Sequence, residues 1–314
     1  MDYRHLGKAG LRLSELSFGA WLTFDREEDL ERMRSCVMAA FDAGVNFFDN
    51  AEVYGRGTGE RLMGIILESF RREDLVISTK IFWGGEGPND EGLSWKHLME
   101  GTRNSLRRLK LDYVDLLYCH RPDPNTPIEE TVRAMDVIIR SGMAFYWGTS
   151  MWPRESIEEA HRIARELGCI PPAVEQPEYN LFNRQRVEQE YLPLYERYGM
   201  GLTTWSPLDS GILTGKYQQG IPPGTRLERQ EWLRKRLTEE KRLKVSRLQE
   251  LAGDLSCSLP QLAIAWCLKN PHVSSVITGA TTPDQVRENM GAATVKQKLD
   301  RSVMDRIEEI LGGC

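Results

Sequence analysis

Short apolar runs alternate with segments of helical periodicity along almost the whole chain. Most of these runs are continuously apolar rather than alternating, which is typical of parallel strands buried on both faces. We predict strands at 16–18, 46–50, 75–80, 114–120, 144–150, 173–179, 201–207 and 273–279. Eight such strands, separated by helical segments, favour a closed (β/α)₈ TIM barrel in a single domain, 1–314, over an open doubly wound sheet.

The residues between these strands indicate where helices start and which face they bury. One core-facing stripe is predicted at helical spacing, formed by Trp95, Leu98, Met99, Thr102, Leu106 and Leu109. Thr126 precedes Pro127 and lies three residues before Glu129, which predicts a helix capped by Thr126. A similar capping pattern runs from Ser258 to Gln261.

Three segments fall outside the regular alternation. Residues 3–6 and 11–13 flank a Gly-rich turn and predict a hairpin that plugs the N-terminal end of the barrel. Residues 82–93 form a Gly-rich loop directly after a strand, where it would make part of a pocket wall. Residues 221–247 begin as a Pro/Gly loop and become a strongly charged helix, and further helices are expected towards the C-terminus.

Composition excludes several classes of protein. The formal charge of −5 and the pI near 5.7 argue against a general nucleic-acid binder. The local positive excess at 226–247 contains one aromatic residue, Trp232, and fits a solvated helix beside an anionic cofactor better than a nucleic-acid site. Because no apolar run approaches the length of a signal region or membrane span, we expect a soluble, cytoplasmic protein.

The cysteines carry no sign of a metal site or a disulfide framework. They stand at positions 36, 119, 169, 257, 267 and 314, without a CxxC pair. A chain of 314 residues can bury a large core and does not need such cross-links. We therefore predict reduced thiols and no metal.

Polar residues end three of the predicted strands. Asp49, Lys80 and His120 each lie at or next to the last residue of an apolar run, and Tyr54 lies in the loop after the first run. In a barrel the carboxyl ends of the strands meet at one face, where enzymes of this architecture keep their chemistry. We expect the four side chains to lie close together there.

These four residue types suit a proton donor aimed at a carbonyl group. Free tyrosine has a pKa near 10, too high for an efficient acid at neutral pH. A neighbouring Lys80 ammonium is expected to lower the pKa of Tyr54, Asp49 to hold Lys80 charged, and His120 to orient the carbonyl oxygen. Taken singly, the same residues also fit a turn aspartate, a solvated lysine, and a packed histidine and tyrosine. Their conjunction favours the catalytic interpretation.

A proton donor for carbonyl reduction needs a source of hydride, which no side chain supplies. The chain lacks GxGxxG spacing: 55–59 follows a strand but fits a flexible loop better. The strand at 273–279 runs into Thr282-Pro283-Asp284-Gln285, a capped helix start with Arg287 in the next turn. Barrels often bind phosphate after strands seven and eight, although an ordinary capped helix explains the same pattern.

Several dispersed motifs resemble the aldo-keto reductase family and, within it, the potassium-channel β-subunit-like branch. Besides Asp49, Tyr54, Lys80 and His120 in their contexts, they are Ala51-Glu52-Val53-Tyr54-Gly55, His120-Arg121-Pro122-Asp123, Trp205-Ser206-Pro207-Leu208, Gly215-Lys216-Tyr217 and Glu288-Asn289-Met290-Gly291-Ala292. The resemblance extends from Tyr3 to about residue 310. It implies a (β/α)₈ barrel that binds NADPH without a Rossmann fold.

The resemblance also implies roles for individual residues. Tyr54 would be the general acid, supported by Asp49, Lys80 and His120. The implied cofactor contacts are Trp21, Ser150 and Gln176 at the nicotinamide, Trp205, Ser206, Pro207, Leu208, Lys216 and Arg226 at the pyrophosphate, and Gly279, Thr281, Gln285, Glu288 and Asn289 at the adenosine end. Trp21, Trp83 and Trp152 follow strands on the same face and are expected to line an apolar substrate pocket.

Three positions depart from the pattern of the branch. Channel β-subunits typically carry asparagine in place of His120, so the histidine favours catalysis over a pure sensor. Met151 replaces a polar or basic residue, which would leave fewer carboxamide contacts. Asp209 replaces a small neutral residue near the phosphates, and we expect Lys216 and Arg226 to offset its charge.

The expected function is the NADPH-dependent reduction of aldehydes or ketones to alcohols, with a small carbonyl compound as substrate. An NADPH-binding regulatory or sensor subunit with little turnover is the alternative. A barrel isomerase or lyase that uses the same residues without nicotinamide is a third, disfavoured by the matched cofactor segments. The branch includes tetramers and octamers, so a homo-oligomer is also open.

Overall fold

A closed barrel of eight parallel strands forms the centre of the molecule, in the order β10-β3-β4-β5-β6-β7-β8-β9. The computed structural model describes residues 1–21 and 25–312. The strands are β3 Leu16–Gly19, β4 Phe47–Asp49, β5 Val76–Ile81, β6 Val114–Cys119, β7 Ala144–Thr149, β8 Val174–Glu175, β9 Gly201–Thr204 and β10 Val273–Thr278. Each lies within or within one residue of a predicted apolar run, so the predicted (β/α)₈ barrel is confirmed.

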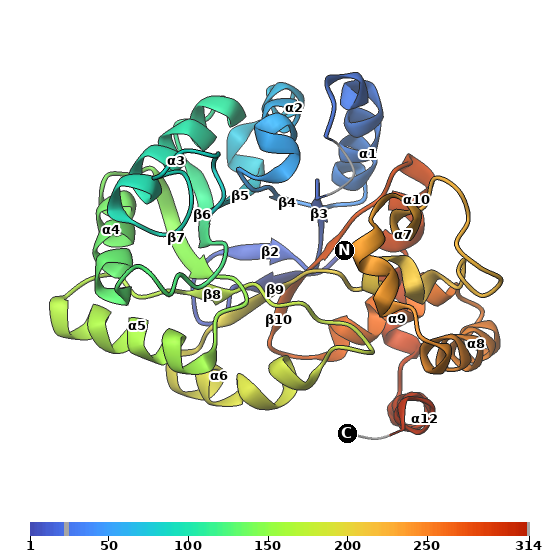
Figure 1. Ribbon diagram of the computed structural model, residues 1–314. Helices are drawn as coiled ribbons and strands as arrows, with labels where there is room; N and C mark the ends of the chain where they lie inside the picture. Colours follow the sequence, from blue (N-terminus) through green and yellow to red (C-terminus); the bar gives the residue numbers. More distant parts are fainter. Residues whose placement is uncertain (22–24, 313–314) are drawn as a thin grey trace.

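Helices surround the strands in chain order, and α8 and α12 pack together at the periphery (Figure 1). The segment predicted as a charged helix comprises α7, the 3₁₀ helix η6 and the start of α8. The helix bounds are α1 Leu30–Asp42, α2 Thr58–Leu67, α3 Trp95–Leu109, α4 Ile128–Arg140, α5 Arg154–Leu167, α6 Leu192–Tyr198, α7 Arg226–Arg229, η6 Glu231–Arg236, α8 Glu239–Asp254, α9 Leu259–Lys269, α10 Pro283–Met290, α11 Ala292–Val295 and α12 Arg301–Leu311.

The predicted hairpin, β1 Tyr3–His5 and β2 Arg12–Ser14, closes one end of the barrel. Its Leu6 and Leu13 are fully buried in a cluster with side chains from inside the barrel, including Phe47 and Leu116. At the turn, Gly7 has φ +55 and a Cβ there would lie 2.2 Å from the carbonyl oxygen of Gly199. Only glycine fits this contact, so the hairpin plugs the barrel as predicted.

Two local predictions were wrong. Trp95 is 39% exposed and Met99 is half-buried, and the buried face of α3 begins at His97 and Leu98. Thr126 does not cap α4: Pro127 occupies the N-cap position, and the Thr126 hydroxyl donates to Asp123 Oδ2 at 2.7 Å. This charged carboxylate also receives the backbone N–H groups of Leu93 and Asn125, so it holds the Thr126 side chain in the loop that precedes α4. Ser258, by contrast, forms the expected capping box of α9.

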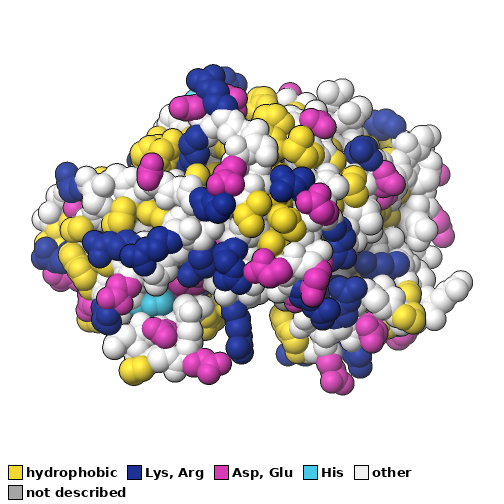
Figure 2. All heavy atoms as spheres, turned by 90° about the horizontal axis from the view of Figure 1, so that it is seen from above, with side chains coloured by type: hydrophobic (Ala, Val, Ile, Leu, Met, Phe, Trp, Pro, Cys, Tyr) yellow, Lys and Arg dark blue, Asp and Glu magenta, His cyan; other side chains and the backbone are white. Residues whose placement is uncertain are grey.

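The face shown in Figure 2 carries charges of both signs, and the described cysteines are unpaired. On the face shown in Figure 2, Lys and Arg side chains are interspersed with Asp and Glu rather than gathered in one field. Five cysteines are free thiols, and Cys314 lies outside the described residues. Among the described residues no single helix is long and apolar enough to cross a membrane. Helices α8 and α9 meet that criterion only as a pair bent by 90°.

Candidate active site

A cleft of about 1120 Å³ opens at the carboxyl ends of the barrel strands. Its floor is formed by residues at or just beyond strand ends, among them Gly19, Asp49, His120, Ser150 and Gln176. The opposite end of the barrel is filled by the hairpin, so a ligand would reach the polar side chains at the strand ends through this cleft. It is the place where a barrel is expected to carry its chemistry.

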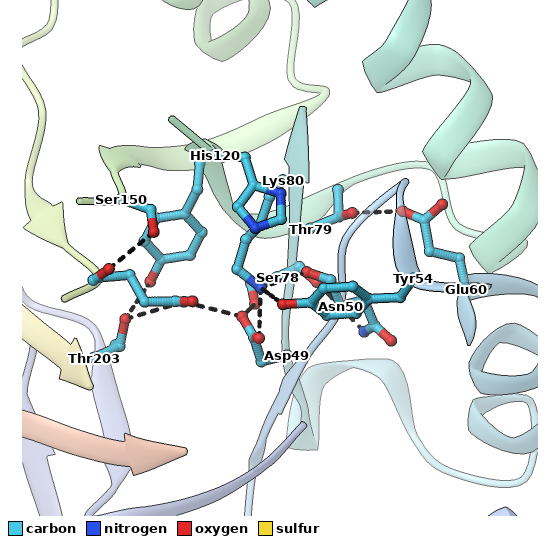
Figure 3. Close-up of polar contacts among 12 residues, drawn as sticks. Asp49, Asn50, Tyr54, Glu60, Ser78, Thr79, Lys80, His120, Ser150 and Thr203 are labelled. Atoms are coloured by element: carbon cyan, nitrogen blue, oxygen red, sulfur yellow. Dashed lines mark hydrogen bonds and ion pairs between the residues drawn. The ribbon is translucent and has the colours of Figure 1, made fainter. Parts of the chain in front are cut away.

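Asp49, Lys80 and Tyr54 converge on one buried point beneath the cleft (Figure 3). The Lys80 ammonium donates to Asp49 Oδ2 at 2.5 Å, to the Asn50 carbonyl at 2.8 Å and to the Tyr54 hydroxyl oxygen at 3.0 Å. The other carboxylate oxygen, Asp49 Oδ1, accepts hydrogen bonds from Ser78 and Gln176. Lys80 therefore has three fixed acceptors, and the tyrosine keeps its own O–H to donate.

Strand register explains how distant residues reach this point. Strands β4 and β5 are parallel neighbours in which Asp49 pairs with Ser78, and Lys80 lies two residues further along on the same side of β5. Tyr54 begins the short 3₁₀ segment Tyr54–Gly57, where Gly55, Arg56 and Gly57 have φ of 57°, 53° and 88°. This left-handed stretch, in which two of the three residues are glycine, turns the chain sharply from the tyrosine into α2.

Burial dominates the ionisation of the tyrosine. It raises the pKa of Tyr54 well above 10, and the negative charge of Asp49 adds to that effect, while Arg121 opposes it. The expectation that Lys80 lowers this pKa is thus wrong for the structure as it stands. Desolvation lowers the pKa of Lys80 itself, against the opposing attraction of Asp49. Tyr54 consequently remains a protonated donor over the neutral range.

His120 faces the same site as a neutral imidazole. Burial, followed by the charges of Lys80 and Arg121, lowers its pKa well below 6.5. Its ring lies edge-on to Tyr54 with centroids 6.0 Å apart, and 5.1 Å from the ring of Trp83. Since Nδ1 is buried without a hydrogen-bond partner in the described structure, the ring orientation is set by packing.

Every residue expected to contact the cofactor lines this one cleft. Two of them, Lys216 and Arg226, are cations with no carboxylate at ion-pair distance in the described part of the chain, and burial lowers the pKa of each. The Arg226 guanidinium lies 5.5 Å from the Trp21 ring, which in turn meets Trp205 edge-on. The full set is Trp21, Ser150, Gln176, Trp205, Ser206, Pro207, Leu208, Lys216, Arg226, Gly279, Thr281, Gln285, Glu288 and Asn289.

The predicted helix start after β10 is present. Thr282 caps α10 by accepting from the Gln285 backbone N–H at 3.3 Å. Gln285 Oε1 accepts from both the backbone N–H and the hydroxyl of Thr281, at 2.9 and 3.0 Å. Thr281 and Gln285 therefore stand together at the cleft wall as one hydrogen-bonded pair.

The charge of Asp209 is offset, but not by the expected residues. Asp209 is fully buried, and its carboxylate lies 3.0 Å from Arg236 Nε and 2.5 Å from Lys241 Nζ. Arg236 also pairs with the buried Glu178. The charged segment thus anchors itself over the barrel through Asp209, which leaves Lys216 and Arg226 without this partner.

One predicted pocket residue differs from expectation, and the contact of Met151 is now defined. Trp83 lines the cleft, but Trp152 is 2% exposed, packs in the hydrophobic core and is absent from the cleft lining in the described structure. Its assignment to a substrate pocket was therefore wrong, because a tryptophan after a strand can also fold back under the helices. Met151, with φ 59, directs its sulfur to the backbone N–H of Glu178 at 3.3 Å.

Among the cleft residues that sequence reasoning missed, two are polar residues close to predicted ones. Arg121 follows His120 and lines the cleft beside Trp83. Ser210 also lines it, with a buried hydroxyl that has no partner in the described structure. Arg121 stands inside a motif quoted for its resemblance, and Ser210 follows Asp209 directly. Their types and positions were visible, but their exposure to the cleft was not.

Comparison with known proteins gives consistent matches. The family model described as "Aldo/keto reductase family" matches residues 15–312. A protein of Oryza sativa subsp. japonica named "Probable voltage-gated potassium channel subunit beta" is 56% identical, over 99% of this chain and 97% of its own length. A protein of Arabidopsis thaliana with the same name is also 56% identical over the same shares.

Proposed function

Because the chain belongs to the aldo/keto reductase family, we propose that it is an oxidoreductase that binds NADPH and reduces aldehydes or ketones to alcohols, with Tyr54 as proton donor. One observation carries this proposal. The Tyr54 hydroxyl lies 3.0 Å from a fully buried Lys80 ammonium at the floor of a large cleft. A solvated lysine would not be held against a tyrosine in this way.

The residues present fit an extended, phosphate-bearing cofactor. Lys216 and Arg226 bring positive charge to the cleft without carboxylate partners in the described chain, and the hydroxyls of Ser206 and Ser210 are buried there without hydrogen bonds. Arg226 is half-buried and Lys216 is exposed, so the cost of an unpaired cation falls mainly on Arg226, and buried hydroxyls without an acceptor are costly as well. Trp21, Ser150 and Gln176 would hold the nicotinamide end, and Thr281 and Gln285 the 2′-phosphate. When bound, NADPH supplies the hydride.

The chain's own groups then handle charge and proton at the carbonyl oxygen. Tyr54 donates its proton as negative charge develops on that oxygen. Lys80 stabilises the tyrosinate that is left, and Asp49, itself held by Ser78 and Gln176, keeps the ammonium in place. His120 as a neutral imidazole can donate one hydrogen bond that orients the oxygen. Preorganised donors of this kind supply much of the rate enhancement of such sites.

The experiment is a fluorescence titration with NADPH and with NADH, followed by NADPH oxidation in the presence of 4-nitrobenzaldehyde or methylglyoxal. We expect tighter binding of NADPH than of NADH and measurable oxidation with at least one carbonyl. Absence of binding to either nucleotide would favour a barrel isomerase or lyase.

The five free cysteines support a reducing compartment, and we propose a cytoplasmic location.

A regulatory subunit that binds NADPH and turns over little is the second candidate. It is favoured by the names of the two plant relatives, both described as probable voltage-gated potassium channel β subunits. Tight NADPH binding without oxidation by any carbonyl, together with a stably co-purifying channel protein whose affinity depends on NADPH, would select it over the reductase.

A further inference from the structure

We propose that Arg121 is a substrate-recognition residue and that the preferred substrates are carbonyl compounds bearing a carboxylate. This inference rests on the proposed reductase function and specifies its substrate class. Arg121 follows the last strand residue of β6 by two positions and lines the cleft together with Tyr54, Trp83 and His120. It therefore lies on the side of the cleft where the carbonyl group would react.

One edge of the Arg121 guanidinium is occupied and the other is open. Nη1 donates to the His120 carbonyl at 2.5 Å and to the Ser150 hydroxyl at 3.3 Å. In the described structure Nε and Nη2 have no hydrogen-bond partner, and neither atom is fully buried. Because Arg121 lines the cleft, both atoms are accessible from it. The Nε–Nη2 edge presents two parallel N–H groups, which match the two oxygens of a carboxylate.

The charge of Arg121 is also uncompensated. Across the described residues no carboxylate lies at ion-pair distance from it, and Glu175 and Glu178 act on it only from further away. Burial lowers its pKa, which reflects the cost of holding a cation there without a partner. An anionic group of the substrate would remove that cost.

Two other cations of the cleft have a different assignment. Lys216 and Arg226 belong to the segments proposed for the cofactor phosphates, whereas Arg121 lies beside the proton donor. Its guanidinium lies 5.6 Å from the Trp83 ring, which stands 5.1 Å from the His120 ring. A flat or apolar linker against Trp83 would join a carboxylate at Arg121 to a carbonyl at Tyr54 and His120.

The test compares 4-carboxybenzaldehyde with 4-nitrobenzaldehyde, which have similar shape and differ in charge. We expect Arg121→Gln to lower the ratio of kcat/KM for the carboxylated over the nitro compound by roughly 10- to 100-fold. Arg121→Lys keeps the charge but loses the pair of parallel N–H groups, so its kcat/KM ratio should lie between those of the wild type and Arg121→Gln. Arg229→Gln removes an exposed cation of the same cleft and should leave the ratio unchanged.

Three outcomes overturn the assignment. They are an unchanged ratio in Arg121→Gln, an equal fall in Arg229→Gln, and an equal loss for both aldehydes accompanied by weaker NADPH binding, which would make Arg121 a cofactor residue. If neither aldehyde is turned over, the proposed function fails separately. Quenching of bound NADPH fluorescence by the two aldehydes then gives the same comparison as a ratio of Kd values, with the same outcomes for and against Arg121.

Discussion

The two ends of the barrel differ in how their cations are paired. Two cations at the hairpin end share one carboxylate, whereas three cations of the cleft have none at ion-pair distance in the described structure, although Lys80 beneath them is paired with Asp49. At the hairpin end, Arg4 and Lys296 share the buried carboxylate of Glu15, at 3.1 and 2.7 Å. Arg4 also donates to backbone carbonyls of Leu268 and Val273. At the cleft end, Arg121, Lys216 and Arg226 have no carboxylate at that distance within the described chain.

The difference separates folding from binding. A cation paired inside the chain stabilises the native state or costs little, whereas an unpaired one in a partly desolvated place lowers stability. Arg121 and Arg226, which have no carboxylate partner in the described structure, lower stability at places where an external anion can restore it. Lys80, Arg4 and Lys296 are already paired within the chain. The sites of local destabilisation are therefore the sites at which ligands are expected.

The largest expected effect comes from removing the proton donor at the cleft end. Tyr54→Phe should lower kcat by about 10²–10⁴-fold while NADPH affinity stays unchanged, because only the hydroxyl is lost. Steady-state kinetics and fluorescence titration measure the two quantities. Tyr195→Phe is the matched control: its buried hydroxyl donates to the Val187 carbonyl at 2.9 Å, away from the cleft. Retained turnover in Tyr54→Phe would remove this residue from the acid role.

A smaller effect, on stability alone, is expected at the closed end. Glu15→Gln leaves Arg4 and Lys296 without their shared carboxylate and should lower the free energy of unfolding by about 1–3 kcal/mol. Urea denaturation measures this loss, and NADPH affinity should not change. The exposed Glu250→Gln serves as control, with a change of at most about 0.5 kcal/mol. Equal losses in both variants would contradict the neutralised cluster.

The smallest effect is expected from an open cation. Burial, reinforced by the charge of Arg226, lowers the pKa of Lys216 from 10.5 in the folded protein. In the pH range between the pKa of the folded state and that of the unfolded state, the unfolded chain therefore binds more protons than the folded one. Stability should therefore rise with pH across that range in the wild type and rise less in Lys216→Met. The variant should also bind NADPH roughly 3- to 10-fold more weakly. Parallel stability curves would show that Lys216 is not strained by burial.

The sequence predicted those parts of the molecule that depend on local pattern. Buried strands give continuous apolar runs, and a polar residue that ends such a run must lie at the barrel face, which is why Asp49, Lys80 and His120 could be placed. The hairpin and the capping box of Ser258 are local in the same sense.

Long-range partners could not be predicted in this way. Asp209 meets Arg236 and Lys241 only because the charged segment folds back over the barrel. The Thr126 hydroxyl is held by Asp123, a partner that capping propensities do not consider, and α4 has no side-chain cap. The sign of the pKa shift of Tyr54 depends on how deeply the ring is buried. Which edge of the Arg121 guanidinium stays open depends on the backbone carbonyl that its Nη1 contacts.

Closure of the barrel has a consequence for the order of events during synthesis. Strand β3 pairs on one side with β10, and the Ser275 hydroxyl donates to the Ser14 carbonyl across 261 positions of sequence. At roughly 5–20 residues per second, the first barrel strand leaves the ribosome on the order of 10–50 s before the strand that completes its pairing. Until then the nascent sheet has two open edges. Rapid folding of the adjoining βα units, or a chaperone that shields those edges, is required during this interval.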